Sequence, residues 1–484
     1  MIRAWIEEAA ARHGADVYLA DARGAGSLTY AGLLDVVRET ERRLDDAGLP
    51  PGARISVRLA DPLDYATALV ALIAAGRVAV PLDPGAPDTD IARVLGVARP
   101  AGVVTGRAPA GPGAMDGGGN SGDTPPFGIT AFDPSPLTSG TGGGGIFLCT
   151  SGTTGTPKGI LLREAQLAHV ASSVAGWHRL SRADRGYCSL PLFHVNAEVV
   201  GLLGTLRAGA YLAVDRKFSR RGFWERIAAD RITWINAVPA IISILAMDPP
   251  AAPPTALRFV RSASAPLPLA ALERFEKASG VPVIETYGMT EAASMITANP
   301  LDGPRKPGSA GKPAGSEVRI GGAGAAADIG RVLIRGGGVI TAYASGGRPG
   351  AIDADGWLDT GDLGYLDEDG YLFLVGRSDD VINRGGEKIY PREIEEVLLA
   401  QPGVRSAAVI GAADEVLGER PVAYVVPDGG TVADEVEALL RAVCAEQLPR
   451  HKQPSEFWLV DEMPLGPTGK ISRRLLKEAV AAHS

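Results

Sequence analysis

Residues 146–162 read IFLCTSGTTGTPKGILL, and this stretch governs the fold prediction for the whole chain. An apolar run opens into a loop of Gly, Ser and Thr, which closes on Lys158 before a second apolar run. Glycines let a backbone approach a ligand closely, while amides, hydroxyls and an ammonium group bind phosphate oxygens. Because Gly159 follows Lys158, this is not the G-x-x-x-x-G-K-[ST] loop of P-loop NTPases. The stretch predicts a polyphosphate ligand; the plainer interpretation is a flexible polar hairpin with an exposed lysine.

Strand and helix patterns alternate on both sides of this loop. Residues 28–81 pass from a helical pattern through ARISVRL and DYATALVALIAAG to RVAVPL, and strand-like runs recur at RITWINAV, ALRFVRSAS and VPVIETYG. Such alternation is typical of a buried parallel sheet with helices on both faces. We expect two doubly wound α/β subdomains, with a Gly-, Pro- and Ser-rich surface loop at 106–145.

The remainder of the chain predicts a β-rich part and then a separate domain. From about residue 308 to 375, short strands alternate with Gly and Asp turns, which is typical of a small β-rich subdomain. Beyond Arg377, the order helix, strand, strand, helix fits a compact α+β domain. The predicted class is therefore α/β, with a large N-terminal domain (1–378) and a small, mobile C-terminal domain (379–484). A chain of 484 residues exceeds the roughly 250 to 300 at which one core divides.

Composition excludes several classes of protein. The net charge is −8 and the pI about 5.5, so the sequence indicates neither nucleic-acid binding nor attraction to an anionic membrane. No apolar stretch reaches the roughly 20 clean residues of a membrane span, and the N-terminus lacks the apolar core of a signal peptide. Three scattered cysteines form no C-x-x-C pair and fit a reducing cytoplasm.

Further motifs follow the loop in a fixed order. They are PLFHV (191–195), ETYGMTEA (285–292), DTGD (359–362), GRSDDVINRGGEKI (376–389) and PTGKISRR (467–474). Together with TSGTTGTPKG (150–159), they make nearly the whole chain resemble the adenylate-forming superfamily. LRFVRSASAPL, YGMTEA and VGRSDDVINRGGEKI are most similar to its acyl- and oxalyl-CoA synthetase branch. The resemblance implies that the polyphosphate is ATP, used with Mg²⁺ and CoA.

The resemblance assigns a nucleotide site to the central motifs. It implies that Tyr287 stacks on adenine, Thr290 contacts the α-phosphate and Glu291 holds Mg²⁺, which suits an aromatic face, a hydroxyl and a carboxylate. Asp362 and Arg377 are implied to bind the ribose. Without the resemblance, Tyr287 would be a packing residue and Asp362 a solvated turn aspartate. The other implied nucleotide contacts are Thr150, Ser151, Gly152, Thr153, Thr154, Lys158, Ala265 and Gly288.

The C-terminal motifs are implied to serve two catalytic poses. Lys470 matches the lysine that neutralises developing charge during adenylation, and Asp379 matches the hinge about which the small domain swings. Gly385 and Gly386 would let the backbone lie along the pantetheine arm of CoA, or simply form a tight turn. Basic runs such as residues 467–474 are otherwise solvated surface.

The acyl pocket is implied to include His194, Val238 and Met289. His194 joins Lys470, Thr290 and Glu291 among the catalytic candidates, but a lone histidine is more often a satisfied rim residue than a base. We expect it to shape or gate the site.

The motifs together predict an acyl-CoA synthetase that converts a carboxylic acid, ATP and CoA to acyl-CoA, AMP and pyrophosphate through an acyl-adenylate. One alternative is adenylation followed by transfer to a carrier protein. Another is an enzyme that performs a single half-reaction, such as thioester formation from a supplied adenylate. A third is a catalytically silent nucleotide-binding protein. No arginine pair demands a dicarboxylate, so the identity of the acid stays open, as does the oligomeric state.

Overall fold

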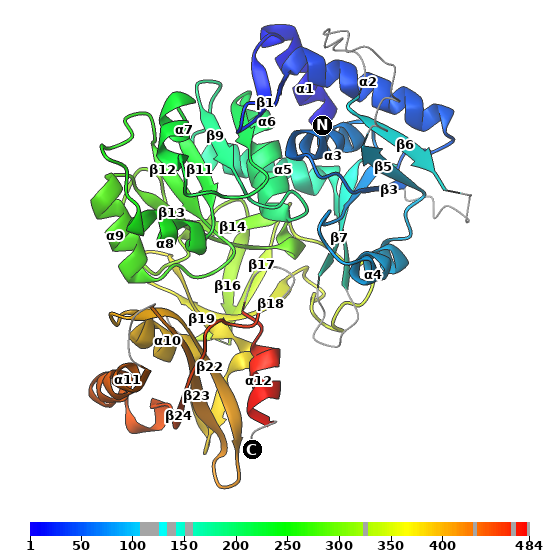
Figure 1. The fold of residues 1–484 in the computed structure, drawn as a ribbon. Helices are drawn as coiled ribbons and strands as arrows, with labels where there is room; N and C mark the ends of the chain where they lie inside the picture. Colours follow the sequence, from blue (N-terminus) through cyan, green and yellow to red (C-terminus); the bar gives the residue numbers. More distant parts are fainter. Residues whose placement is uncertain are drawn as a thin grey trace.

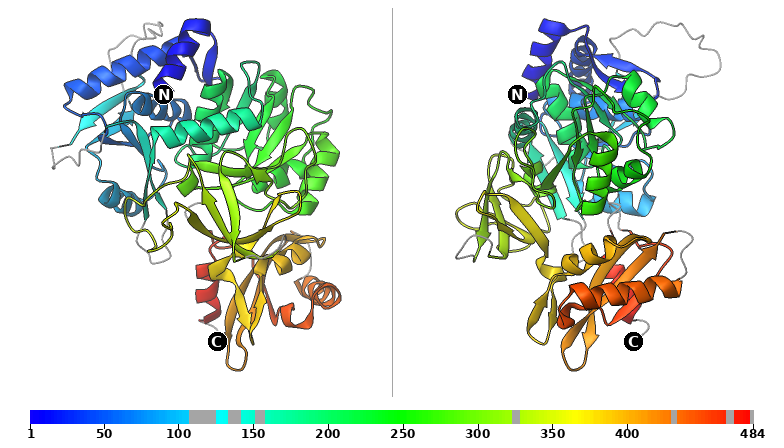
Figure 2. Two further views of the ribbon diagram at one scale, coloured as in Figure 1. Left: turned by 180° about the vertical axis from the view of Figure 1, so that it is seen from behind. Right: turned by 90° about the vertical axis from the view of Figure 1, so that its left-hand side faces the viewer.

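The computed structural model describes residues 1–106, 125–132, 142–150, 158–322, 328–428, 433–465 and 471–481. Two α/β sheets form the large part of the molecule, and a β-rich subdomain packs beside them. A small domain lies at one end (Figure 1). The two termini lie in different parts, the N-terminus beside the sheets and the C-terminus in the small domain (Figures 1 and 2). The predicted α/β class with a small C-terminal α+β domain is confirmed.

The first sheet has six strands in the order β6-β5-β3-β4-β7-β8. Its central strands pair in parallel, whereas the edge strands β6 and β8 run antiparallel. Asp61 caps α3 by accepting hydrogen bonds from the amides of Leu63 and Asp64, and Pro62 occupies the first helical turn, where no donor is lost. The elements are α1 (Ile2–His13), α2 (Tyr30–Asp46), β3 (Arg54–Val57), α3 (Pro62–Ala74), β4 (Val78–Pro81), α4 (Asp88–Ala98), β5 (Gly102–Gly106), β6 (Phe127–Ala131), β7 (Gly145–Thr150) and β8 (Lys158–Arg163).

Strand β6 corrects the predicted surface loop at 106–145. It pairs with β5 along its whole length and buries Phe127, whose side chain is 1% exposed. The Gly- and Pro-rich flanks concealed this short run, because its strand conformation is stabilised by pairing and burial at the sheet edge rather than by local sequence.

The second sheet has nine strands in the order β15-β14-β13-β12-β11-β9-β10-β1-β2. The strands from β13 to β1 in this order pair in parallel, whereas β14, β15 and β2 run antiparallel at the two edges. Both sheets are therefore mixed, and the prediction of purely parallel sheets is corrected. The strands are β1 (Val17–Asp21), β2 (Ser27–Thr29), β9 (Arg185–Cys188), β10 (Tyr211–Val214), β11 (Trp234–Ala237), β12 (Phe259–Ser262), β13 (Val283–Met289), β14 (Ser294–Ala298) and β15 (Lys312–Pro313). The helices are α5 (Glu164–Trp177), the π-helix η1 (Asn196–Leu203), α6 (Gly204–Ala208), α7 (Phe223–Ala229), α8 (Pro239–Met247) and α9 (Leu269–Ser279).

Helix α5 lies between the two sheets and contacts β7, β14 and η1 (Figures 1 and 2). One large core of buried side chains runs through both sheets and into the β-rich subdomain, and a smaller cluster lies between α4 and the first sheet. The small C-terminal domain has separate clusters of its own on the two faces of its sheet. Separate cores are what independently moving parts require.

The β-rich subdomain is an antiparallel sheet in the order β16-β17-β18-β19, and the C-terminal sheet has the order β21-β20-β23-β22, with β24 beside β23. The expected helix, strand, strand, helix pattern is present, with further short strands and a last helix around it. The elements are β16 (Glu317–Gly321), β17 (Gly330–Arg335), β18 (Leu358–Leu366), β19 (Leu372–Arg377), β20 (Ile382–Arg384), β21 (Glu387–Ile389), α10 (Pro391–Leu399), β22 (Val404–Asp414), β23 (Gly418–Pro427), α11 (Ala433–Gln447), β24 (Glu456–Leu459) and α12 (Arg473–Ala481). Within the described part of the chain, no helix combines the length and apolar character needed to cross a bilayer.

Candidate functional site

Tyr287, Asp362 and Arg377 meet where the second sheet joins the β-rich subdomain. The hydroxyl of Tyr287, on β13, donates to Asp362 Oδ2 at 2.5 Å. Arg377 donates from Nη1 to Asp362 Oδ1 at 3.1 Å, because β18 and β19 pair with these two residues opposite each other. Burial, and then the Asp362 carboxylate, raises the pKa of Tyr287 well above its usual range, so its hydroxyl remains a donor. The cluster presents an aromatic ring that suits a nucleobase, and a carboxylate and a guanidinium that suit the hydroxyls of its ribose.

Replacing Asp362 with alanine is expected to weaken ATP binding by about 10- to 100-fold, the range for hydrogen bonds to a charged group. The change removes the predicted ribose acceptor and takes away the carboxylate to which the Tyr287 hydroxyl donates. Calorimetric titration with a non-hydrolysable ATP analogue measures the loss. Asp355→Ala, at an exposed aspartate in a turn of the same subdomain, is the matched control. Equal affinities in the two variants would contradict the assignment.

A second cluster joins Lys158 to Glu291 through Tyr343. The ammonium nitrogen of Lys158, at the start of β8, lies 5.7 Å from the centre of the Tyr343 ring. The Tyr343 hydroxyl donates to Glu291 Oε1 at 3.1 Å. Burial, and then the Glu291 charge, raises the pKa of Tyr343, so this hydroxyl also remains a donor at neutral pH. One aromatic side chain therefore contacts a cation through its ring and a carboxylate through its hydroxyl.

The segment that carries Tyr343 also contacts the strand that follows the phosphate loop. Gly159 N donates to Ser345 O at 3.0 Å, and Ala344 N donates to Gly159 O at 2.9 Å. A Cβ at Gly159 would lie 2.6 Å from Ser345 Oγ, so this approach requires glycine. Sequence analysis missed Tyr343 and Ser345, since the only local signal is one aromatic residue after a glycine-rich stretch.

The segment Gly288 to Ser294 has an unusual backbone. A Cβ at Gly288 would lie 1.7 Å from Ser294 O, and Ala293 and Ser294 have φ values of 49° and 100°. Thr290 begins a 3-10 turn, Thr290–Ala292, and Glu291 O accepts from Ile340 N at 2.8 Å. Left-handed conformations in non-glycine residues are costly and occur preferentially at functional sites.

The predicted acyl-pocket residues follow neighbouring strands of the second sheet. His194 follows β9, Val238 follows β11 and Met289 ends β13, and Ala265, a predicted nucleotide contact, follows β12. These strands are neighbours in the order β13-β12-β11-β9 and pair in parallel, so their carboxyl ends lie at one edge. Ligands of open α/β sheets bind at that edge. The structure therefore brings the four residues to the same side of the sheet.

The predicted phosphate contacts Ser151, Gly152, Thr153 and Thr154 and the adenylation residue Lys470 lie outside the described residues. Thr150 is described. It pairs with Lys158 across β7 and β8, so the two ends of the phosphate loop are neighbours.

The predicted hinge and CoA residues lie at the entry to the C-terminal domain. Asp379 is in the 3-10 turn Ser378–Asp380, between β19 and β20. Gly385 and Gly386 have φ values of 60° and 92° and form the turn between β20 and β21. Gly385 N donates to Leu417 O at 2.7 Å. The tight-turn interpretation of the glycines is confirmed, and their role toward CoA stays a prediction.

Glu285, at the start of the ETYGMTEA motif, lies near the C-terminal domain. Burial is the main cause that raises its pKa to about 7, and the nearby carboxylates of Glu276 and Glu396 raise it further. The hydrogen bond from Gly308 N–H and the charge of Arg392 on α10 act in the opposite direction. In the unfolded chain its pKa is near the ordinary 4.5. The protonated form is therefore favoured by folding.

The raised pKa of Glu285 predicts that Glu285→Gln increases the stability of the folded protein in a pH-dependent way. Because the folded pKa is the higher one, the contribution of Glu285 to stability is intact below pH 4.5 and is lost as the pH rises through 7. The loss is on the order of 3 kcal/mol. Thermal unfolding should show the glutamine variant more stable than wild type at pH 8 and close to it at pH 5. The exposed Glu273→Gln on α9 is the control, and an equal gain at both pH values would contradict the assignment.

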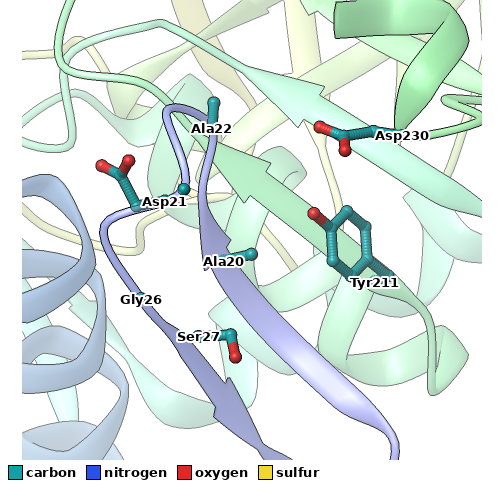
Figure 3. Close-up of a pocket in the computed structure, with 8 residues that line it drawn as sticks. Ala20, Asp21, Ala22, Gly26, Ser27, Tyr211 and Asp230 are labelled. Carbon is teal, nitrogen blue, oxygen red and sulfur yellow. The ribbon is translucent and has the colours of Figure 1, made fainter.

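A cavity elsewhere in the fold does not suit a nucleotide. Figure 3 shows Asp21, Tyr211 and Asp230 around it, and its volume is about 350 Å³. It lies by β1, β2 and β10, away from the motif clusters. Its lining residues include two carboxylates and no cation, which would repel phosphate.

Comparison with known proteins matches most of the chain to one family. The family model described as "AMP-binding enzyme" matches residues 6–126 and 146–344, and the model described as "AMP-binding enzyme C-terminal domain" matches residues 393–470. A sulfoacetate–CoA ligase of Cupriavidus necator is 43% identical over 342 residues, which cover 69% of this chain and 67% of the relative. An oxalate–CoA ligase of Arabidopsis thaliana is 36% identical over 487 residues, 94% of each chain.

Solved structures agree with the fold over its whole length. ATP-bound MatB from Rhodopseudomonas palustris is 27% identical, with a TM-score of 0.85 and 99% of both chains covered. The o-succinylbenzoate CoA synthetase MenE from Bacillus subtilis, in complex with ATP and magnesium ion, is 27% identical, with a TM-score of 0.81 over 98% of this chain and 99% of that one. Both relatives therefore bind ATP on a fold closely similar to this one.

Proposed function

The chain belongs to the AMP-binding enzyme family and is an ATP-dependent acid–CoA ligase, and we propose that it catalyses both half-reactions. In the first, the carboxylate of the acid attacks the α-phosphate of ATP and expels pyrophosphate. In the second, the thiol of CoA attacks the acyl-adenylate and AMP leaves. The first step joins two anions, so positioning and fixed positive charge are the main requirements.

The observation that carries the proposal is the junction of Tyr287, Asp362 and Arg377. Tyr287 stacks on adenine, and Asp362 and Arg377 bind the ribose hydroxyls. Lys158 binds the terminal phosphates together with residues 150–154, and Tyr343 keeps its ammonium near the bound nucleotide. Thr290, in the turn after β13, donates to the α-phosphate.

Glu291 fits a magnesium site. Its carboxylate is a hard oxygen donor, its side chain is largely buried, and Tyr343 already orients one of its oxygens. Glu291 would hold the ion together with phosphate oxygens of the substrate, which are also hard donors. When bound, Mg²⁺ neutralises phosphate charge. Tyr343 and the backbone bond from Ile340 hold Glu291 in place.

The two half-reactions use different poses of residues 379–484 relative to residues 1–378. Asp379 is the hinge, and the short 3-10 turn between β19 and β20 supports this assignment. Lys470 acts in the adenylation pose. In the second pose, the turn of Gly385 and Gly386 receives the pantetheine arm, where the absence of side chains leaves room for it.

The acid lies between His194, Val238 and Met289, near Ala265 and Gly288. We take the acceptor to be CoA rather than a carrier protein, because the relatives are CoA ligases. Sulfoacetate, oxalate and 2-succinylbenzoate carry a second acidic group beside the activated carboxyl, whereas indoleacetate does not. We propose that the enzyme acts in the cytoplasm, which supplies ATP and CoA and would keep the three free cysteines reduced.

Two assays test the proposal. Exchange of labelled pyrophosphate into ATP across a panel of acids measures adenylation, and a supplied acyl-adenylate with CoA measures thioester formation. Both activities are expected with one acid. Exchange without acyl-CoA formation, but with transfer to a phosphopantetheinyl carrier protein, would replace CoA as the acceptor. Activity in only one assay would establish a half-reaction enzyme.

A further inference from the structure

Arg261 is a buried cation on the second sheet. It lies on β12 with an exposed fraction of 1%, opposite Asn236 of β11, which in turn lies opposite Cys188 of β9. These side chains therefore form a row across adjacent parallel strands near their carboxyl ends. Gly201 of η1 packs over the row, since a Cβ there would lie 3.4 Å from Cys188 Sγ.

The guanidinium of Arg261 contacts uncharged acceptors. Its Nη1 donates to Asn196 Oδ1 at 2.7 Å and to Asn236 Oδ1 at 3.1 Å, while Nε has no partner in the part of the chain that the structure describes. No ion pair involves Arg261 among those residues. Burial lowers its pKa to about 9, so it still carries its proton at neutral pH.

Neighbouring titratable groups do not compensate this charge. His178 is buried beside Arg261, and burial, then Arg261 and Arg258, lowers its pKa to about 3, so it is neutral. Burial raises the pKa of Cys188 to about 11, so its thiol is neutral as well. A buried charge without a counter-ion costs free energy, and cations in protein interiors are therefore paired or bind an anion.

The cluster of Arg261, Asn196 and Asn236, which we call the Arg261 cluster, adjoins the proposed acyl pocket. Asn196 comes two residues after His194, and Asn236 two residues before Val238. Asn196 Nδ2 also donates to Ser264 Oγ at 3.5 Å, which links the cluster to exposed Ser264 beside Ala265. Ser264 has a φ of 76°, a conformation that is costly for serine.

We propose that the Arg261 cluster binds a second anionic group, a carboxylate or a sulfonate, at the far end of the acid substrate. This inference rests on the proposed function, and it specifies the substrate class as short acids with two anionic groups. One group reacts at the α-phosphate, and the other supplies the counter-ion that the guanidinium lacks among the described residues. The planar guanidinium suits either oxyanion, and the two asparagines fix its orientation.

Length-matched acid pairs test this proposal. The wild-type enzyme is assayed with oxalate and acetate, malonate and propionate, succinate and butyrate, and sulfoacetate and propionate. In at least one pair, kcat/KM for the doubly charged acid is expected to exceed that for its partner by about 100-fold or more, because a site built for a polar group rejects the analogue that lacks it. A preference for the singly charged acid in every pair would overturn the proposal.

Arg261→Met and Arg261→Lys separate recognition from structure. Methionine is expected to lower kcat/KM for the doubly charged acid by about 100-fold, with KM for ATP unchanged and activity on the matched acid retained. Arg261→Lys keeps the charge without the planar guanidinium. Its kcat/KM for the doubly charged acid is therefore expected to lie between those of wild type and Arg261→Met. Arg258→Met, which removes a partly buried arginine immediately before β12, should leave the selectivity ratio unchanged. Equal losses for both acids in Arg261→Met would mark a structural role and overturn the proposal.

A measurement on the wild-type protein decides the question if the variants do not fold. The favoured doubly charged acid, without ATP, should raise the unfolding temperature, and its singly charged partner should not. The absence of any differential shift would overturn the Arg261 assignment. If no acid is converted to acyl-CoA, the proposed function fails, and the thermal shift still decides whether the cluster binds an anionic acid.

Discussion

Replacing Lys470 with alanine is expected to reduce adenylate formation by about 10³-fold while leaving thioester formation from a supplied adenylate unchanged. In the first half-reaction, negative charge concentrates between the attacking carboxylate and the α-phosphate, and a positioned ammonium stabilises that arrangement more than it stabilises the separate reactants. Pyrophosphate exchange measures the first step. Product analysis with the purified acyl-adenylate and CoA measures the second.

The control for Lys470 is Lys477→Ala, an exposed lysine on α12 that follows the same basic motif. It should keep both activities, because removing one surface charge changes the local field only slightly. An equal fall in both half-reactions of Lys470→Ala would contradict the proposed division of labour between the two poses. A fall confined to thioester formation would reverse it.

Glu291→Gln is expected to lower adenylation by about 10²- to 10³-fold, the range for loss of one electrostatic stabiliser of the transition state. Glutamine has nearly the same shape and can still accept from the Tyr343 hydroxyl, so the fold around the TEA turn is kept. It lacks the negative charge that holds a hard cation. Raising the magnesium concentration should recover part of the activity, which a pyrophosphate-release assay measures.

Tyr343→Phe tests whether Glu291 acts through its charge or through its hydrogen bond. It removes the hydroxyl that donates to Glu291 Oε1 and keeps the ring beside Lys158. Loss of one such bond should cost about 2- to 10-fold in adenylation, far less than loss of the carboxylate. If Tyr343→Phe is as impaired as Glu291→Gln, then orientation of Glu291, and not magnesium binding, is the dominant contribution.

The sequence predicted the architecture well wherever a segment's own pattern specifies it. The strands at Arg54–Val57, Trp234–Ala237 and Phe259–Ser262 lie within the predicted alternating runs. The small C-terminal domain contains the expected helix, strand, strand, helix order. The antiparallel edges and β6 were missed, because an edge strand is stabilised by a partner that is distant in sequence.

Local spacing also predicted much of the candidate site. The phosphate loop, the TEA segment and the Gly385–Gly386 turn are contiguous motifs whose glycines, hydroxyls and charges express their chemistry within a few residues. A motif, however, shows which chemical groups are present and does not show which distant residues they contact. Tyr287 and Asp362 are 75 residues apart, and only pairing of β18 with β19 and the packing of that sheet against β13 bring them together with Arg377.

By itself, then, the sequence determined the order of most elements and predicted the polyphosphate loop and the chemical groups around it, because these depend on neighbours along the chain. Tertiary structure alone decided that Tyr343 links Lys158 to Glu291, and that Arg261 is buried beside two asparagines with no acidic partner among the residues that the structure describes. In the sequence, Arg261 is one arginine among many. Its significance depends on burial and on the absence of a counter-ion among the described residues, and both arise only when separate strands and η1 pack together.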